Sequence, residues 1–343
     1  MDGNLLNELV ALRRDLHAHP ELGFEEERTS GIVADWLDRR GLVVARGVGR
    51  TGVVGSLRVG EGKRAIALRA DIDALAMPET GSVPWRSQHA GRMHACGHDG
   101  HTAMLLGAAA ELCASRDFSG TVHFVFQPAE EGMGGARAMI ADGFFDRYAI
   151  DAVYGLHNMP GLAVDEIAVV EGPQLASSDS WQVRFHGTGT HGAKPHLGKD
   201  AVTAAAHFLS MLHSIVAREI DPLQPAVVSA CDFRALNVIP DSVRIGGTAR
   251  AYTAAVRDQL EASIARLAAG TAAAFGIEAD PEFERRIGPV VNAPAPTALA
   301  RQAAVRAVGS GNVLTQFPPS TAGDDFAEFA ARVPGCYAWL GNG

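Results

Sequence analysis

Residues 121–127 read TVHFVFQ, a short run of apolar and β-branched residues that is typical of a buried strand. Three similar runs lie nearby: GVVGSLRV at 52–59, AIALRAD at 65–71 and AVYGLH at 152–157. Helical patterns separate several of these runs, notably at 102–114 and 135–141. Apolar strands that alternate with helices indicate an α/β fold, with a mainly parallel sheet covered by helices on both faces. Ligands of such sheets bind beyond the carboxyl ends of the strands.

Before these strands, the sequence predicts two helices. Leu5, Leu9, Leu12 and Leu16 share one helical face, and this pattern ends at Pro20. A second helix is expected over 29–40, with Gly41 just after it as a helix-ending residue.

From residue 178 the order of elements changes to strand, helix, two strands, helix and strand. The runs and helical patterns that carry it are WQVRFHG (181–187), 199–217, AVVSACDF (226–233), SVRIGGTARAY (242–252), 255–275 and ADPEFERRI (279–287). This order is that of a ferredoxin-like α+β sandwich. We therefore expect residues 178–288 to be a domain inserted into a larger one, formed by 1–177 and 289–343. A helix over 324–332 and a strand CYAWLG (336–341) would complete the larger domain.

Composition narrows the classes of function. The formal net charge of -9 argues against nucleic-acid binding, which needs a basic face. The first residues are amphipathic and not signal-like, and no apolar run reaches membrane-spanning length. The four cysteines are scattered, which fits a reducing cytoplasm better than a disulfide framework.

The densest chemical signal is MHACGHDGHT at 93–102, which holds His94, Cys96, His98 and His101. Only 13 histidines occur in 343 residues, so this clustering calls for an explanation. The glycines at 97 and 100 favour a tight turn, in which Cys96 and His98 can converge on one metal ion. The alternative, a buried cysteine beside surface histidines, leaves four candidate ligands in one loop unexplained.

Two more strands end in similar chemistry. FVFQPAEEG at 124–132 leads into the adjacent carboxylates Glu130 and Glu131, which repel each other unless a cation or proton separates them. One of the two would bind metal while the other acts as general base on water. AVYGLHN at 152–158 delivers His157 at a strand end. A solvated Glu-Glu pair or a packed histidine is common by itself, but here three connections agree at one sheet edge.

In this order, the residues resemble the aminoacylase/carboxypeptidase-type metal amidohydrolases, in the hippurate hydrolase and auxin-conjugate hydrolase branch. The resemblance covers nearly the whole chain. Beside the motifs above, it rests on LRRDLHAHPELGFEE (12–26), LRADIDALAMPE (68–79), GTGTHGAKPH (187–196), NVIPDSVRIGGTAR (237–250) and AGDDFAEF (322–329).

The resemblance implies a pair of divalent ions (Mn, Zn, Co or Ni) held by Cys96, His98, Glu131 and His157. It makes Glu130 the general base and places Asp71 near the metals. The wider family has His-x-Asp where this chain has Arg69-x-Asp71, so Arg69 is not expected to be a ligand. The implied reaction is hydrolysis of the amide bond of N-acyl amino acids, such as hippurate-like or N-acetyl compounds, to a carboxylic acid and a free amino acid.

The resemblance also gives the inserted domain a role as a lid and dimerisation domain. His191 is expected to steady the oxyanion, and Asn237 and Arg250 to hold the substrate carboxylate, for which a guanidinium is well suited. A homodimer or higher homo-oligomer is expected on the same ground.

The chain departs from the family pattern at two places. Asp324 stands where relatives usually have Glu, and the sequence reaches Gly343 without the His-x-Pro-x-Tyr-Asp-Phe segment whose histidine completes the metal site in relatives. We therefore expect a truncated form, and an inactive metal-binding or dimerising protein is one alternative. Another is a dipeptidase or aminopeptidase on the same scaffold. A zinc deaminase is excluded, because its His-x-Glu and Pro-Cys-x-x-Cys motifs are absent from the sequence.

Overall fold

A computed structural model describes residues 3–234 and 239–343 of the chain. The described chain forms two compact units, one of residues 1–172, 291–318 and 324–343, the other of residues 173–290 and 319–323. The roles expected for these two parts, catalytic domain and lid, stay predictions. Within the described ranges, the structure contains no helix that is long and apolar enough to span a bilayer.

The first unit is built on an eight-stranded sheet with the order β1-β2-β4-β3-β5-β14-β6-β13. Its strands are β1 (Val43–Val48), β2 (Gly52–Val59), β3 (Ala65–Asp71), β4 (Gly120–Gln127), β5 (Ala152–Met159), β6 (Ile167–Ala168), β13 (Val313–Leu314) and β14 (Gly335–Gly341). The central strands β4, β3, β5 and β14 are parallel, whereas β1, β2 and β6 pair antiparallel with their inner neighbours. The mainly parallel sheet expected from the apolar runs is therefore confirmed.

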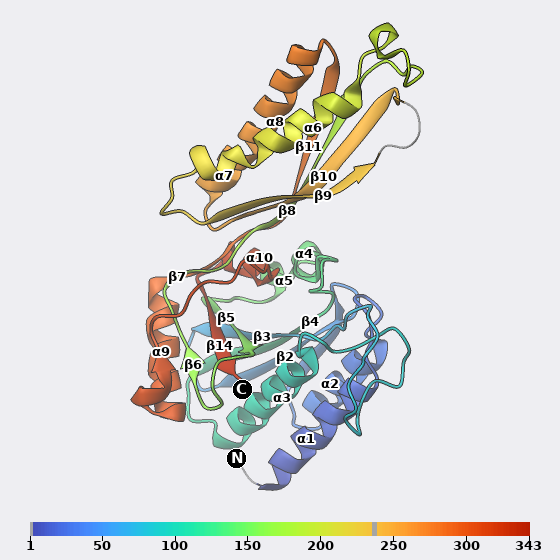
Figure 1. Ribbon diagram of the computed structural model, residues 1–343. Coiled ribbons are helices and arrows are strands. Elements are labelled where there is room, and N and C mark those ends of the chain that lie inside the picture. The colour runs from blue at the N-terminus through green and yellow to red at the C-terminus, as the bar shows by residue number, and fades with distance from the viewer. Residues whose placement is uncertain (1–2, 235–238) are drawn as a thin grey trace. The chain divides into compact units, whose positions relative to one another are not determined.

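Helices cover both faces of this sheet (Figure 1). They are α1 (Gly3–Ala18), α2 (Glu27–Asp38), α3 (His98–Ser115), α4 (Gly135–Ala141), α5 (Phe144–Arg147), α9 (Pro294–Val308) and α10 (Phe326–Ala330), with a short 3₁₀ helix at Ser310–Asn312. Helices α1 and α2 pack with α3 on one face, whereas α4, α5 and α10 lie on the other. The core beneath α3 contains the fully buried Leu106, Phe124 and Phe126.

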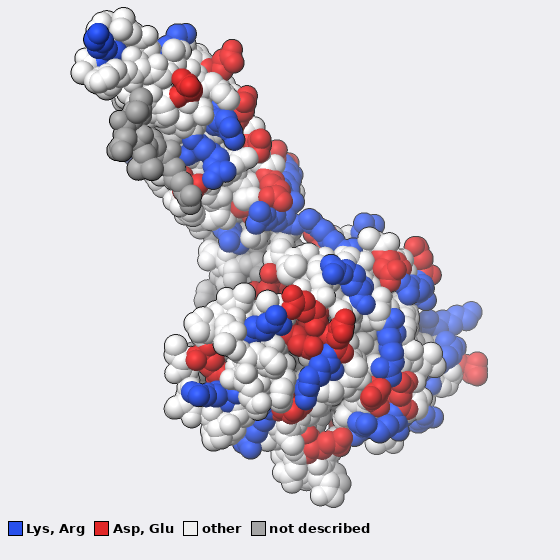
Figure 2. All heavy atoms as spheres, turned by 90° about the vertical axis from the view of Figure 1, so that its right-hand side faces the viewer, with Lys and Arg blue, Asp and Glu red and all other residues white. Residues whose placement is uncertain are grey.

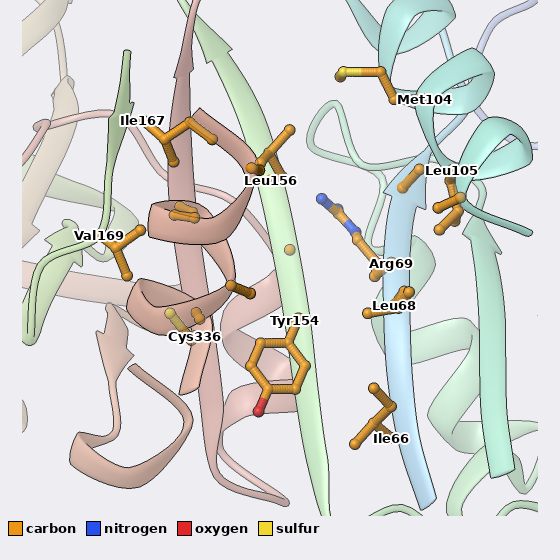
Figure 3. A pocket seen from close by; sticks show the side chains of 18 of the residues that line it. Ile66, Leu68, Arg69, Met104, Leu105, Tyr154, Leu156, Ile167, Val169 and Cys336 are labelled. Atoms are coloured by element: carbon orange, nitrogen blue, oxygen red, sulfur yellow. The ribbon is translucent and has the colours of Figure 1, made fainter. Parts of the chain in front are cut away.

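An apolar groove of about 630 Å³ runs over β3 and β5, between α3 and α9 (Figure 3). Side chains from all four elements line it, among them Leu68, Leu105, Leu156 and Ala300. Helix α9 therefore lies on the same face of the sheet as α3, and the groove separates the two.

The second unit is a four-stranded antiparallel sheet with the order β11-β8-β10-β9. Its elements are β8 (Ser178–His186), a 3₁₀ turn at Pro195–Leu197, α6 (Ala201–Leu212), α7 (Ser214–Arg218), β9 (Ala226–Arg234), β10 (Ser242–Ala251), α8 (Ala254–Phe275) and β11 (Glu278–Ile287). The strands β7 (Gly172–Leu175) and β12 (Val290–Asn292) lie where the chain passes from one unit to the other. The chain order and the sheet order are those of the ferredoxin-like sandwich expected from the sequence.

Local signals explain where the long helices of this unit begin and end. The Asp200 side chain accepts hydrogen bonds from the backbone of Val202 and Thr203, and so caps the start of α6. Thr253 caps α8 in the same way, and Gly276, with φ of 61°, ends it. The single helix expected over 199–217 is in fact two, α6 and α7, which meet at His213.

Charged side chains of both signs are interspersed on the face of the molecule shown in Figure 2. This mixture is that of an ordinary solvated surface, and a basic stripe is not seen on this face.

Candidate metal centre

The candidate ligands come from three segments at one edge of the parallel sheet. His157 lies near the carboxyl end of β5, Glu130 and Glu131 follow β4, and Cys96 and His98 stand at the start of α3. Because β3, β4 and β5 are parallel, the residues that leave their carboxyl ends meet at the same edge. Gly97 makes the entry into α3 possible, since its φ of 93° lies in the left-handed region.

The structure brings the four expected ligands into two overlapping groups. Possible ligand atoms of Cys96, His98 and His157 lie within 4.8 Å of one another, and those of His98, Glu130 and Glu131 do the same. The Cys96 sulfur is 3.3 Å from Nε2 of His157. His98 belongs to both groups, so it stands between the thiol side and the carboxylate side of the cluster.

Hydrogen bonds turn one nitrogen of each histidine toward the cluster. Nδ1 of His157 lies 2.7 Å from the carbonyl oxygen of Asn158, and Nδ1 of His98 lies 3.2 Å from Asp73. Nε2 of both rings is then left for a ligand, as in most metal sites with histidine. Nε2 of His98 and Oε1 of Glu131 are buried without a hydrogen-bond partner. Thiol, imidazole and carboxylate donors with unpartnered buried atoms fit a divalent transition metal.

Burial shapes the protonation of these groups. It raises the pKa of the Cys96 thiol and of the Glu131 carboxyl, and it lowers the pKa of His157 to about 4, with His101 adding to the effect. Burial alone would lower the pKa of His98, but the charge of Asp71 and the hydrogen bond to Asp73 raise it well above its ordinary value. A bound cation favours the deprotonated ligands and would displace these protons.

Glu130 lies beside the cluster and is 7% exposed. Burial, together with the negative charges of Asp324 and Asp325, raises the pKa of its carboxyl well above the ordinary value. A carboxylate with a raised pKa is a stronger proton acceptor, which is what a general base at neutral pH requires.

Arg69 is not among the ligand candidates, and its guanidinium binds carboxylates. It lies 2.7 Å from Asp71, 3.0 Å from Asp324 and 3.4 Å from Asp325, and its Nε donates to Gln127 at 2.7 Å. Its side chain is 3% exposed, so these are buried ion pairs.

Asp324 has two side-chain partners in this network. Besides the guanidinium of Arg69, it accepts a hydrogen bond from the Tyr337 hydroxyl at 2.7 Å. Its carboxylate is therefore held on two sides, within reach of Glu130.

Asp71 lies next to the cluster, as expected. Its Oδ1 is 2.6 Å from Nδ1 of His101, and its Oδ2 is 3.8 Å from Nε2 of His98. His101 in turn lies 2.7 Å from Oδ1 of Asn158. Asp71 and Asn158 thus hold the His101 ring from both sides.

The sequence reasoning missed three residues that support the cluster, Asp73, Asn158 and Asp325. Asp73 stands two residues after Asp71, and Asn158 directly follows His157. Their nearness to these motif residues is the only sign in the sequence that could have pointed to them. His94, by contrast, does not join the cluster: its ring lies 6.4 Å from that of His17, and both of its nitrogens are buried without a hydrogen-bond partner.

The remaining candidates belong to the second unit. His191 is exposed in the loop after β8, and its Nδ1 accepts a hydrogen bond from the Ala193 backbone. Arg250 on β10 lines a polar hollow of about 590 Å³ on the sheet, together with Ser180 and Thr248. Asn237 lies outside the described residues.

The chain is similar to known hydrolases over almost its whole length. It is 39% identical over 342 residues to the N-acetyl-L-cysteine deacetylase of Bacillus subtilis, covering 98% of this chain and 81% of the relative. It is 39% identical over 343 residues to the hippurate hydrolase of Campylobacter jejuni, covering 99% and 89%.

The chain is also similar in fold and sequence to a solved structure. The Bacillus subtilis YXEP protein, a dinuclear metal binding peptidase from the M20 family, has a TM-score of 0.87 and 34% identity, covering 99% of this chain and 90% of that one. Residues 67–343 match the sequence pattern of the same family. With this match and with relatives at 39% identity, the chain belongs to peptidase family M20/M25/M40.

Proposed function

We propose that the chain is an amidohydrolase that cleaves the amide bond of small N-acyl amino acids and uses two divalent metal ions. The observation that carries the proposal is the convergence of unpartnered Nε2 of His98 and Oε1 of Glu131 beside the buried Glu130. The class of substrate follows from the two relatives, whose names describe removal of an acyl group from N-acetylcysteine and from hippurate.

Cys96, His98, Glu131 and His157 would hold the ions. When bound, divalent ions of this kind polarise a carbonyl group and make water a better nucleophile at neutral pH. Glu130 accepts the proton of the attacking water and returns it to the departing nitrogen, so that the C–N bond breaks and a free amino acid leaves. Asp71 orients His101 beside the ligands. His191 is proposed to donate to the developing oxyanion, and Asn237 and Arg250 to bind the substrate carboxylate.

The finer expectations on assembly and location are part of the same proposal. We expect a homodimer formed through the second unit, in the cytoplasm. Light scattering on the purified protein measures the mass of the assembly, and a monomer at micromolar concentration would contradict the dimer.

Glu130→Gln tests the catalytic part of the proposal. The amide keeps the shape of the side chain but cannot accept the proton, so we expect kcat to fall by about 10²–10⁴-fold. The assay follows release of free amine from N-acetylcysteine and from N-benzoylglycine by protein loaded with Mn²⁺ or Zn²⁺. Glu166→Gln is the control, because that carboxylate accepts a hydrogen bond from the Ala163 backbone at 3.2 Å and belongs to none of the candidate ligand groups of the described residues. Near-normal turnover by the Glu130 variant, at unchanged metal content, would contradict the assignment.

A further inference from the structure

Glu26 is buried against the loop that carries the proposed general base. It lies at the start of α2 and is 0% exposed, yet its side chain makes no hydrogen bond that caps its own helix. Its Oε1 accepts a hydrogen bond from the backbone N–H of Ala129 at 2.8 Å, and its Oε2 accepts one from the Thr51 hydroxyl at 2.6 Å. The carboxyl group therefore connects the start of a helix to the residue that precedes Glu130.

The backbone of Ala129 has an unfavourable conformation that needs such a partner. Its φ of 51° lies in the left-handed region, which few residues other than glycine adopt. Ala129 is fully buried, and its carbonyl oxygen accepts a hydrogen bond from the backbone N–H of Gly135 at 3.0 Å. Its own N–H has the side chain of Glu26 as acceptor, and a buried N–H without an acceptor would be costly.

The segment that carries Glu26 also packs directly on Ala129. A Cβ built on Gly23 would lie 3.0 Å from both Cα and Cβ of Ala129. The direction of the chain after Ala129 depends on its φ, so a return of this angle to the ordinary negative range would turn Glu130 away from its present position.

From this geometry we infer that Glu26 is a positioning residue, which holds Ala129 in the left-handed conformation and so sets the position of Glu130. The inference rests on the proposed function, in which Glu130 is the general base. It goes further in naming a residue far away in the sequence, which acts on the base through the backbone of another residue.

This role needs an acceptor oxygen and not a negative charge. Burial raises the pKa of the Glu26 carboxyl, although the hydrogen bonds from Thr51 and Ala129 lower it. In either protonation state one oxygen can accept from Ala129. In Glu26→Gln the amide oxygen can do the same, while the NH₂ group donates to the hydroxyl oxygen of Thr51. In Glu26→Met no acceptor is left, and the N–H of Ala129 stays buried without a partner.

The first experiment compares the turnover of N-acetylcysteine by the wild type and by these two variants, at equal content of bound Zn²⁺. A misplacement of about 1 Å can cost about 10²-fold in rate, so we expect kcat of Glu26→Met to fall by about 10–100-fold with KM close to that of the wild type. Glu26→Gln should recover most of this loss. Thr51→Val is the control, because it removes a hydrogen bond to the same carboxyl group but not the one from Ala129. It should lower the melting temperature and leave kcat close to that of the wild type.

A second readout requires neither substrate nor metal. Hydrogen exchange of the metal-free protein, followed by mass spectrometry, measures how strongly the backbone N–H groups of residues 129–132 are protected. We expect faster exchange there in Glu26→Met, and exchange as in the wild type in Glu26→Gln.

A third comparison tests whether Glu26 acts through the conformation of Ala129. Glycine adopts a φ of 51° without steric cost, so Glu26→Met should lower kcat less in an Ala129→Gly background than in the wild-type background. A purely structural role of Glu26 would lower kcat equally in both backgrounds.

A kcat and a hydrogen exchange of Glu26→Met that match the wild type would overturn the inference and leave the proposed function intact. Equal losses in Glu26→Met and Glu26→Gln would also overturn it. If Glu26→Met does not fold, Glu26→Ala decides by the same readouts. A metal-loaded wild type that releases no amine would overturn the proposed function, whereas the hydrogen exchange would still show whether Glu26 holds the loop.

Discussion

Replacing Arg69 by Met tests the buried charge network next to the metal centre. Met keeps most of the apolar stem of the side chain and removes the guanidinium. The change leaves Asp71, Asp324 and Asp325 without the cation that lies 2.7, 3.0 and 3.4 Å from them. The side chains of all three aspartates are at most 5% exposed, so water cannot take the place of the guanidinium.

Removing one partner of a buried ion pair costs about 3–5 kcal/mol, because a buried charge stays behind. For a domain of this size class, this corresponds to a loss of roughly 6–20 °C in melting temperature. The difference in stability between Arg69→Met and the wild type should become smaller at acid pH. Although burial opposes it, the charges of His98 and Arg69 hold the pKa of Asp71 well below its ordinary value. A lowered carboxyl pKa contributes stability above the unfolded pKa of about 3.9, and this contribution is lost as the pH falls.

Thermal unfolding followed by circular dichroism at pH 7, and in steps down to a pH of about 2, measures both effects, because the contribution of Asp71 is lost mainly below the unfolded pKa of about 3.9. The control is Arg46→Met, which also loses two carboxylates, Asp35 at 2.8 Å and Asp38 at 2.5 Å, but whose side chain is 48% exposed. Exposed pairs contribute about 0–1 kcal/mol, so this variant should melt close to the wild type. Equal melting temperatures for the two variants at pH 7 would refute the reasoning.

Two further changes probe the surroundings of the centre. Gly97→Ala adds a Cβ at a residue with φ of 93°, and this Cβ would clash with Oδ1 of Asn158, which holds His101. We expect the free energy of unfolding in urea to fall by about 1–3 kcal/mol and Zn²⁺ binding to weaken. Unchanged values of both would contradict the close approach of Asn158 to Gly97. Burial lowers the pKa of His94 to about 4, below its unfolded value of about 6.5, so the unfolded chain takes up a proton that the folded chain refuses as the pH falls. Between pH 7 and pH 4, the free energy of unfolding in urea should therefore fall by about 3 kcal/mol less for His94→Phe than for the wild type. An equal fall for the two proteins would contradict the lowered pKa of His94.

The sequence predicted the elements whose own residues carry the signal. The apolar run of β4 is buried along almost its whole length, whereas β3 and β5 have buried residues that alternate with half-buried ones. Such runs can be recognised as strands from their own residues, without knowing which strand pairs with them. The position of Glu130, Glu131 and His157 at one edge followed from the rule that parallel strands end together. Helix α4 begins and ends where the pattern predicted, because Gly134 precedes it and Asp142 follows it.

Elements that depend on tertiary contacts were missed or misjudged. Helix α9 begins with Pro294 and has little apolar periodicity, and it was not predicted. The strands β6 and β13 are two residues long, and they exist through their pairing with neighbours in the sheet. Asp73 was missed for the same reason: its two partners are distant in sequence, and only the folded chain brings them to one carboxylate.

The position of β14 has a consequence for biosynthesis. This strand is the last of the described strands to leave the ribosome, yet it takes an interior place in the sheet, between β5 and β6. Its Trp339 pairs with His157. The strands and helices of the second unit are synthesised earlier, so that unit can fold while the nascent chain still lacks a central strand of the first. The strand that carries His157 gains its last neighbour only when β14 arrives, so the metal centre is completed only after residues 335–341 have been synthesised.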